Sequence, residues 1–222
     1  MIAILDVDGT LIDSNDAHAL AWVDVGAETD HPIEFERVRW MIGMGGDKVL
    51  PLLTGLHENS KEGKRILDRR GEIFREKYLP QLQPFPNTRE LLERMRDDGF
   101  ELVVASSASD DDMHALLDQA GIRDLITERA SSDDAENSKP EPDIVVAALH
   151  RADARPEDAI MLGDTPYDIE AARSAGVEVV ALRCGGWTDR DLGGAAAIYD
   201  SPADLLQHLK TSPFGGRFMK KS

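Results

Sequence analysis

Hydrophobic and polar positions divide this 222-residue chain into regions of different periodicity. The chain begins with an apolar run, residues 1–5, which Asp6, Asp8 and Gly9 follow at once. A short apolar run that stops at glycine predicts a buried strand ending in a turn. From residue 14 to residue 83, apolar residues instead recur at intervals of three and four, which predicts a series of amphipathic helices.

The second half of the chain alternates between short apolar runs and amphipathic segments. Pro84, Phe85 and Pro86 form a stiff connection before it. Alternating strands and helices are typical of a parallel sheet with crossover helices. The predicted strands are residues 100–105, 125–130, 159–163 and 177–183, the second of them the weakest. The predicted helices are residues 88–99, 110–120, 143–152, 165–176 and 203–209, and residues 212–222 are expected to form a frayed tail.

These patterns predict an α/β protein with a Rossmann-like parallel-sheet core. The core comprises residues 1–13 and 84–222, and residues 14–83 form an α-helical cap domain inserted after the first strand. A chain of this length can build a sizeable core with such an insertion. Because the insertion follows Asp6 and Asp8 closely, the cap would act as a lid that excludes water and selects the substrate.

Charge and cysteine content exclude several functions. The formal net charge of −17 argues against binding to nucleic acid or to an anionic membrane, because both require positive potential. An anionic substrate would need a bound metal and a few local cations inside its cleft. Cys184 is the single cysteine, which excludes an internal disulfide and agrees with a cytoplasmic location. No run reaches transmembrane length, the start lacks a signal-peptide pattern, and we expect a monomer or a weak homodimer.

Polar side chains with catalytic potential follow the predicted strands. Open parallel sheets bind ligands at the carboxyl ends of their strands, so these side chains are expected to share one cleft. Two carboxylates as close as Asp6 and Asp8 repel each other unless a cation, a proton or hydrogen bonds compensate. The Ser106 hydroxyl and the backbone N–H groups after it are suited to hold a phosphoryl oxygen. The set comprises Asp6, Asp8, Ser106, Ser107, Lys139, Asp164 and Asp168.

Four of these segments, in chain order, resemble the four motifs of the haloacid dehalogenase superfamily. They are DVDGT, the serine after a hydrophobic strand, the lysine of SKPEPD, and GDTPYD. The resemblance spans nearly the whole chain, and the helical insertion is similar to the α-helical cap of that superfamily. Each motif alone is weak, but their preserved order makes the combination specific.

The resemblance implies a role for each matching residue. Asp6 would be the nucleophile that forms an aspartyl-phosphate, and Asp8 would protonate the leaving oxygen and later activate water. Mg²⁺ would be bound by Asp6, the backbone carbonyl of Asp8 and Asp164, with Asp168 supporting the metal site. Phosphoryl oxygens would be bound by Thr10, Ser106, Ser107 and Lys139.

Each residue also has a purely structural explanation. Asp6 and Asp8 suit a turn before a glycine. Asp168 has the strongest alternative, because the Thr-Pro pair before it makes a good helix start. Residues 110–112 are interpreted as a cluster of charges at a helix start, and Arg75 as solvated. The order in which the candidates occur along the chain favours the catalytic interpretation of the set.

His18 and the glycine-rich loop IGMGGDK are the candidate specificity elements of the cap. The run DSNDAHALAW resembles β-phosphoglucomutases, in which the histidine helps to couple cap closure to the acid/base aspartate. Those mutases carry an arginine in the cap loop that holds a second phosphate, whereas this loop offers glycine, with Lys48 as a substitute. Gly45, Gly46 and Lys48 are therefore candidate substrate contacts. For His18 the alternative is an ordinary position on an amphipathic helix.

We predict an Mg²⁺-dependent phosphatase, a phosphoric monoester hydrolase of the haloacid dehalogenase type. Its substrate would be a small phosphorylated metabolite, phosphoglycolate-like or a sugar phosphate. One alternative is a β-phosphoglucomutase-type phosphotransferase, and another is a non-catalytic phosphate-binding or regulatory protein of the same fold. Asp8 and Asp164 argue against a dehalogenase, because dehalogenation has no leaving alkoxide to protonate and needs no metal.

Overall fold

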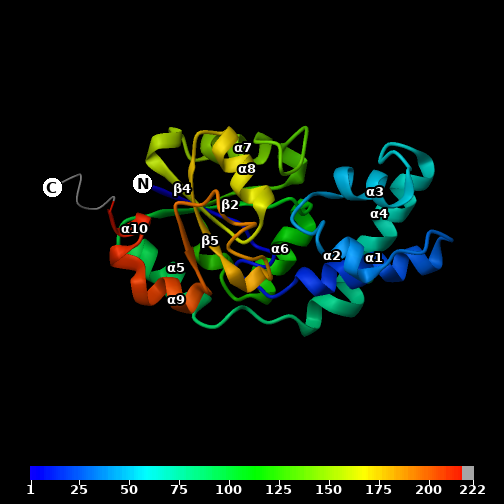
Figure 1. The fold of residues 1–222 in the computed structure, drawn as a ribbon, viewed down its shortest axis with the longest axis horizontal. Helices are drawn as coiled ribbons and strands as arrows, with labels where there is room; N and C mark the ends of the chain where they lie inside the picture. Colours follow the sequence, from blue (N-terminus) through cyan, green and yellow to red (C-terminus); the bar gives the residue numbers. More distant parts are fainter. Residues whose placement is uncertain (217–222) are drawn as a thin grey trace.

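Six parallel strands form the central sheet, in the order β3-β2-β1-β4-β5-β6. The computed structural model describes residues 1–216. β1 lies between β2 and β4, with Leu5 level with Val104 and Leu162, so Asp6 emerges at the middle of the carboxyl edge. Figure 1 shows the sheet at the centre of the core, with α7 and α8 on one side of it and α5 and α9 on the other. The predicted α/β class with a Rossmann-like parallel sheet is confirmed. The strands are β1 (Ile2–Leu5), β2 (Glu101–Ala105), β3 (Glu128–Ala130), β4 (Ala159–Gly163), β5 (Glu178–Leu182) and β6 (Ala197–Tyr199).

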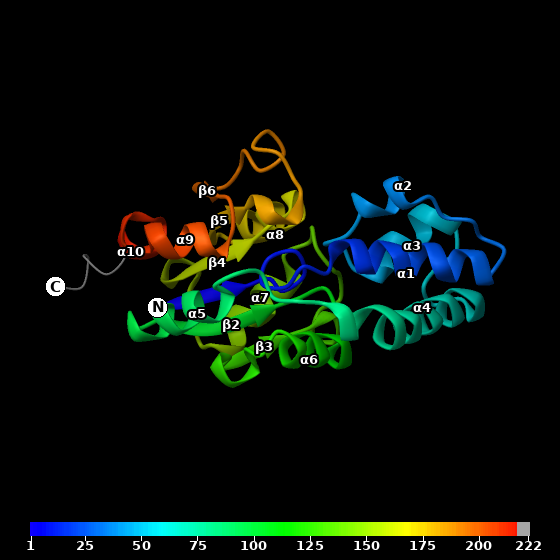
Figure 2. The same cartoon turned by 90° about the horizontal axis from the view of Figure 1, so that it is seen from below.

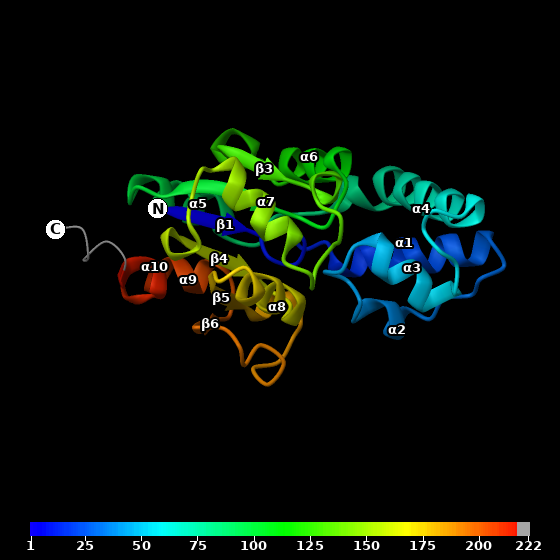
Figure 3. The same cartoon turned by 90° about the horizontal axis from the view of Figure 1, so that it is seen from above.

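Helices cover both faces of the sheet, and the residues of β1 show why. All four residues of β1 are buried, as expected for a strand with apolar contacts on both faces. Ala3 and Leu5 belong to the hydrophobic cluster that contains α5, α6 and α9, whereas Ile2 and Ile4 belong to the cluster that contains α7 and α8 (Figure 3). The helices are α5 (Thr88–Asp97), α6 (Asp110–Gln119), α7 (Asp143–Arg151), α8 (Pro166–Ser174) and α9 (Pro202–His208). None of the helices within residues 1–216 is long and apolar enough to span a membrane.

The cap is a separate group of helices beyond the carboxyl edge of the sheet (Figure 2). Two connections join it to the core, and they run side by side. The backbone N–H of Asp13 donates to Gln83 O at 3.1 Å, and that of Phe85 donates to Leu11 O at 3.2 Å. The cap helices are α1 (Asn15–Glu28), α2 (Phe35–Arg39), α3 (Gly46–Thr54) and α4 (Lys61–Ile73), with a π-helical turn at Phe74–Tyr78.

The edges of the sheet differ from the prediction. β6 is a strand that the sequence pattern did not predict, because its short alanine-rich run is only partly buried and shows no alternation. It is held by its ladder with β5, in which Leu182 lies opposite Tyr199. At the other edge, the predicted strand 125–130 is shortened to β3 by a 3₁₀ turn at Arg123–Leu125.

The expected frayed tail from residue 212 is wrong for its described part. Residues Pro213–Gly216 form the short helix α10, and Phe214 is fully buried. The Phe214 ring packs edge-to-face on Phe100, with ring centroids 5.5 Å apart. One large aromatic side chain thus anchors a segment whose other residues suggested a loop. Residues 217–222 of that prediction lie outside the described residues.

Candidate active site

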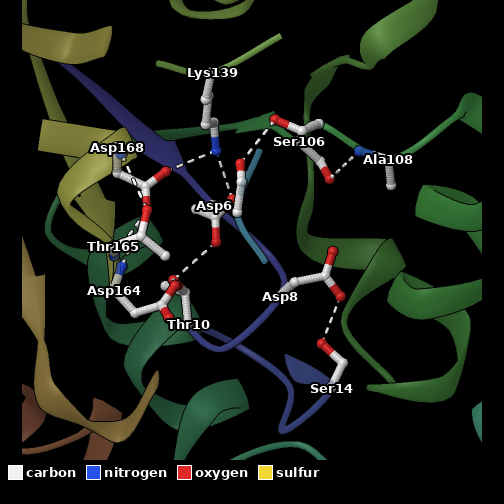
Figure 4. A network of polar contacts seen from close by, with 12 residues as sticks. Asp6, Asp8, Thr10, Ser14, Ser106, Ala108, Lys139, Asp164, Thr165 and Asp168 are labelled. Atoms are coloured by element: carbon white, nitrogen blue, oxygen red, sulfur yellow. Dashed lines mark hydrogen bonds and ion pairs between the residues drawn. The ribbon is translucent and has the colours of Figure 1, made fainter. Parts of the chain in front are cut away.

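The carboxyl ends of β1 and β4 bring the first and last acidic motifs together (Figure 4). The backbone N–H of Asp6 donates to Leu162 O at 2.9 Å and continues the pairing of β1 with β4. The chain then turns at Gly9, where φ is +74°. A Cβ atom at this position would collide with the side chains of Asn15 and Asp164. Glycine is therefore required both by the backbone conformation and by the close approach of the acidic side chain.

Asp6 is held by two hydrogen-bond donors. Lys139 Nζ lies 2.6 Å from Oδ1, and Thr10 Oγ1 lies 2.9 Å from Oδ2. Lys139 is fully buried, and its Nζ is also 2.8 Å from Asp168 Oδ1. Burial lowers the pKa of Lys139, but the carboxylates of Asp168 and Asp6 outweigh burial and raise it. Lys139 is therefore a fixed cation beside Asp6.

An acidic cluster is formed by Asp6, Asp164 and Asp168. One carboxylate oxygen of each residue lies within 4.8 Å of those of the other two. Burial, reinforced by the neighbouring carboxylates, raises the pKa of Asp6 to about 7, although Lys139 acts in the opposite direction. Burial and the carboxylates of Asp6 and Asp168 also raise the pKa of Asp164. Three buried carboxylates beside one ammonium group lack positive charge, and hard oxygen donors suit a divalent cation such as Mg²⁺. The acidic cluster therefore fits the predicted metal.

Asp168 supports this cluster through bonds that occupy both of its oxygen atoms. Its Oδ2 accepts hydrogen bonds from the backbone N–H of Asp164 at 3.3 Å and of Thr165 at 3.0 Å. Thr165 and Asp168 also form the capping box that starts α8. Its Oδ1 pairs with Lys139 at 2.8 Å. The helix-start explanation of Asp168 is therefore confirmed, and the same side chain pairs with Lys139, while its support of a bound metal stays a prediction.

Asp8 faces the cap. Its Oδ1 accepts hydrogen bonds from Ser14 Oγ at 2.5 Å and from His18 Nε2 at 2.7 Å, and His18 is buried on α1. Burial raises the pKa of Asp8, but His18, Ser14 and the Arg70 guanidinium outweigh burial and lower it. An anionic phosphoryl group placed next to Asp8 would act in the opposite direction and favour its protonated form.

The predicted phosphate-binding hydroxyl groups have different surroundings. Ser107 lines a small cavity in front of Asp6. Ser106 is buried, and its Oγ accepts the backbone N–H of Ala108 at 3.1 Å. The Thr10 hydroxyl lies 2.9 Å from two carboxylates of the acidic cluster. Ser107 therefore lines the cavity while its hydroxyl donates to Gly43 O at 3.2 Å, whereas the Ser106 and Thr10 hydroxyl groups bond to groups of the core.

The glycine-rich loop of the cap docks onto the core. The backbone N–H of Gly45 donates to Ser138 Oγ at 3.0 Å, one residue before Lys139. Gly46 lines the cavity in front of Asp6. Lys48, on α3, is not among the described residues that line this cavity or the larger one next to it. Gly45 and Gly46 thus lie at the cleft, and Lys48 lies away from it.

Ser14 and Asn15 are site residues that the sequence analysis did not single out. Both lie where α1 begins, and both reach back into the core. Ser14 contacts Asp8, and Asn15 Nδ2 donates to Asp164 Oδ2 at 3.0 Å. A run of polar side chains directly after the first motif was the available signal, because such residues must lie close to the strand end that they follow.

Asp112 and two arginines of the cap were also missed. Residues 110–112 form the predicted cluster of charges in the first turn of α6, and Asp112 is its buried member, 3% exposed. Its Oδ1 lies 2.6 Å from Arg75 Nη1, and its Oδ2 lies 3.8 Å from Arg70 Nη1. Arg75 is therefore an ion-pair partner as well as a partly solvated side chain. The spacing of four between Asp112 and the buried Leu116 was the available signal, because it places both on one helix face.

Two adjacent cavities lie between cap and core. The small one, of about 60 Å³, is lined by Asp6, Asp8 and His18 among others. Since one water needs roughly 10–15 Å³ by this measure, the small cavity has room for about four to six water-sized atoms, which is enough for a phosphoryl group. The larger cavity has a volume of about 610 Å³. It shares Gly46, Arg70, Ser107 and Ala108 with the small one.

An acidic cluster, a buried lysine and a cavity of this size together suit a divalent cation and a phosphoryl group. Residues 3–182 match the family of haloacid dehalogenase-like hydrolases, and the chain belongs to this family. The predicted family and the assignment as a phosphoric monoester hydrolase are thereby confirmed.

Several relatives that match nearly the whole chain are named as phosphatases. A phosphoglycolate phosphatase of Aquifex aeolicus is 30% identical over 217 residues, with 93% of this chain and 95% of the relative covered. A phosphorylated carbohydrates phosphatase of Thermotoga maritima is 27% identical over 215 residues, with 93% and 97% covered. The solved structure of a hydrolase from Pseudomonas syringae is 28% identical, with a TM-score of 0.85 and with 95% of this chain and 98% of that chain covered.

Proposed function

We propose that the protein is an Mg²⁺-dependent phosphatase that hydrolyses a small phosphorylated metabolite through an aspartyl-phosphate on Asp6. A phosphoglycolate-like compound and a sugar phosphate are the two substrate classes that its relatives suggest. The observation that carries the proposal is the position of Asp6. Its carboxylate lines a cavity of phosphoryl-group size, and the Lys139 ammonium lies 2.6 Å from it.

The chain's own residues divide the work of the reaction. A carboxylate oxygen of Asp6 attacks phosphorus while the bond from phosphorus to the leaving oxygen breaks. Asp8, on the cap side of the same cavity, gives a proton to that leaving oxygen. It then takes a proton from the water that attacks the phospho-enzyme, which releases inorganic phosphate and restores Asp6. Lys139 neutralises negative charge on the transferring group throughout.

Asp6, Asp164 and the backbone carbonyl of Asp8 would hold the Mg²⁺, with Asp168 behind them. When bound, the metal supplies the positive charge that the acidic cluster lacks and neutralises phosphoryl oxygen atoms. Cys184 Sγ lies 3.3 Å from Gly9 O, and its pKa is raised by burial, so it stays a neutral thiol near this site.

The experiment is phosphate release from 4-nitrophenyl phosphate with Mg²⁺ and with EDTA. Release is expected only with the metal and should fall by a factor of roughly 10³ or more in Asp6→Asn, because the nucleophile is lost. Asp118→Asn removes an exposed carboxylate elsewhere on the core and should leave the rate unchanged. Undiminished release from Asp6→Asn would overturn the mechanism. Isomerisation of β-glucose 1-phosphate without net phosphate release would instead favour the mutase.

A further inference from the structure

The larger cavity is the space into which the leaving group of the substrate must extend. It adjoins the small cavity, with which it shares the lining residues Gly46, Arg70, Ser107 and Ala108. A phosphoryl group in front of Asp6 fills the small cavity, so the rest of the molecule lies in the larger one. Its volume of about 610 Å³ is far more than a two-carbon glycolate needs and falls within the range of small-molecule sites.

Carboxylates line both walls of this cavity. Beyond Asp112, the acidic residues are Asp47, Glu58 and Asp68 from the cap, and Asp111, Asp133 and Glu136 from the core. A group bound between the two walls therefore meets negative charge from both sides. These carboxylates lie at partly or fully exposed positions, so salt screens their field without abolishing it.

The cations among the described residues that line the cavity are Arg70 and Arg75. Both already contact other side chains of the protein. Arg75 pairs with Asp112 at 2.6 Å, and Arg70 lies 3.8 Å from the same carboxylate and contacts His18. A second anionic group on the substrate would have to share these arginines with the Asp112 carboxylate. It would also have to enter a cavity in which acidic groups outnumber basic ones.

We infer that the leaving group is an uncharged or cationic polyhydroxy alcohol, as in a sugar, polyol or amino-sugar phosphate. A leaving group with a carboxylate or a second phosphate is disfavoured. This inference rests on the proposed function, because it places the phosphoryl group at Asp6. It separates the two substrate classes left open above, in favour of the sugar phosphate.

Two matched series test the charge preference. The small series is 2-aminoethyl, 2-hydroxyethyl and carboxymethyl phosphate, which differ mainly in the charge at one end. The large series is glucosamine 6-phosphate, glucose 6-phosphate and 6-phosphogluconate. In each series, kcat/KM is expected to fall by about tenfold or more from the neutral to the anionic member in 20 mM salt, and this gap should narrow in 300 mM salt because of screening.

A charge-removing variant connects the preference to the cavity wall. The double variant Asp68→Asn with Asp111→Asn removes one carboxylate from each wall and should raise kcat/KM for the anionic member relative to the neutral one. Asp118→Asn, on the same helix as Asp111 but outside the cavity, should leave that ratio unchanged. The inference would be overturned if kcat/KM for carboxymethyl phosphate and 6-phosphogluconate equalled or exceeded that of the neutral member of each series at both salt concentrations.

Failure of the proposed function would give a different result. In that case 4-nitrophenyl phosphate is not hydrolysed with Mg²⁺. The charge order can still be measured without turnover, by calorimetric binding of both series to the Asp6→Asn variant. Tighter binding of the neutral and cationic esters would support the cavity argument, and tighter binding of the anionic esters would overturn it even if the enzyme is an active phosphatase.

Discussion

The guanidinium of Arg70 contacts Nδ1 of His18, and this contact determines which ring nitrogen carries hydrogen. A guanidinium group only donates hydrogen bonds, so Nδ1 must accept. The hydrogen then resides on Nε2, which donates to Asp8 Oδ1 at 2.7 Å. The ring is further held by stacking on Phe74, with centroids 3.9 Å apart. A residue of α4 thus orients the group that contacts the proposed acid/base.

Loss of the Arg70 donor should disturb catalysis through His18. In Arg70→Met, kcat for 4-nitrophenyl phosphate is expected to fall about tenfold, because His18 is no longer restricted to the form that donates to Asp8. Arg70→Lys, which keeps a donor, should recover part of the rate. The ¹⁵N spectrum of His18 gives a direct readout: the wild type should show the Nε2–H form and Arg70→Met a mixture. A wild-type spectrum of the Nδ1–H form would contradict the assignment.

Asp112 should act on cap closure, because it is a buried core carboxylate paired with cap arginines. Asp112→Asn is expected to raise KM about tenfold with a smaller change in kcat, since the open cap is favoured over the closed one. Asp110→Asn, two residues earlier on the same helix, serves as the control because Asp110 is exposed. Steady-state kinetics measure KM and kcat separately. Equal KM values for Asp112→Asn and Asp110→Asn would show that Asp112 does not act on cap closure.

The two neighbouring glycines of the cap loop should respond differently to alanine. A Cβ atom at Gly45 would lie 2.5 Å from Ser138 Cβ, across the boundary between cap and core. At Gly46 it would meet Leu67 Cδ2 at 2.7 Å, the end of a flexible side chain within the cap. Gly45→Ala should therefore raise KM several-fold, by roughly 1 kcal/mol of weakened closure, while Gly46→Ala changes it little. The reverse order would show that the loop does not dock as described.

Lys139 should be essential for holding the acidic cluster together without metal. Lys139→Met leaves three buried carboxylates without their cation, so the free energy of unfolding in EDTA is expected to fall by about 3–5 kcal/mol. Addition of Mg²⁺ should restore part of it, because the metal compensates the same charges. Lys77→Met is the control, since Lys77 is an exposed lysine paired with Asp24. Urea denaturation measures both, and unchanged stability of Lys139→Met would contradict the charge argument.

Phe214 should contribute to stability without affecting chemistry. Phe214→Ala is expected to lower the free energy of unfolding by about 3–5 kcal/mol, because a fully buried ring is removed. Phe214→Leu, which keeps most of the volume, should cost less. Thermal or urea denaturation checks this, together with kcat at a temperature where both variants are folded. If the denaturation midpoint of Phe214→Ala equalled that of the wild type, residues 212–216 would not be anchored by Phe214 as described.

Local sequence patterns were sufficient to predict the sheet core and the strand ends. The apolar run before Asp6 and the one before Asp164 each specify a buried strand, and parallel strands bring their carboxyl ends to one edge. β6 could not be predicted in this way. Its residues are only partly buried, and its existence depends on hydrogen bonds to β5 that no local pattern encodes.

Contacts between cap and core were the least predictable part of the site. Asp112 appears in the sequence as one of three consecutive aspartates, and nothing local distinguishes it from Asp111 except its helix face. Its partners Arg70 and Arg75 lie 42 and 37 positions earlier in the chain. The packing of one domain on the other decides which partner a charged residue meets, and periodicity within a single helix indicates its face but not that partner.

The paired connections at residues 11–13 and 83–85 make the cap a block that is inserted at a single place in the core. The chain leaves and re-enters the core through two segments that are hydrogen-bonded to each other, so both covalent connections of the cap lie at one place. The cap helices can be exchanged or redesigned as a block without altering the order of strands around Asp6. Substrate range can therefore change through the cap as long as exchanged helices keep the contacts of Ser14 and His18 with Asp8.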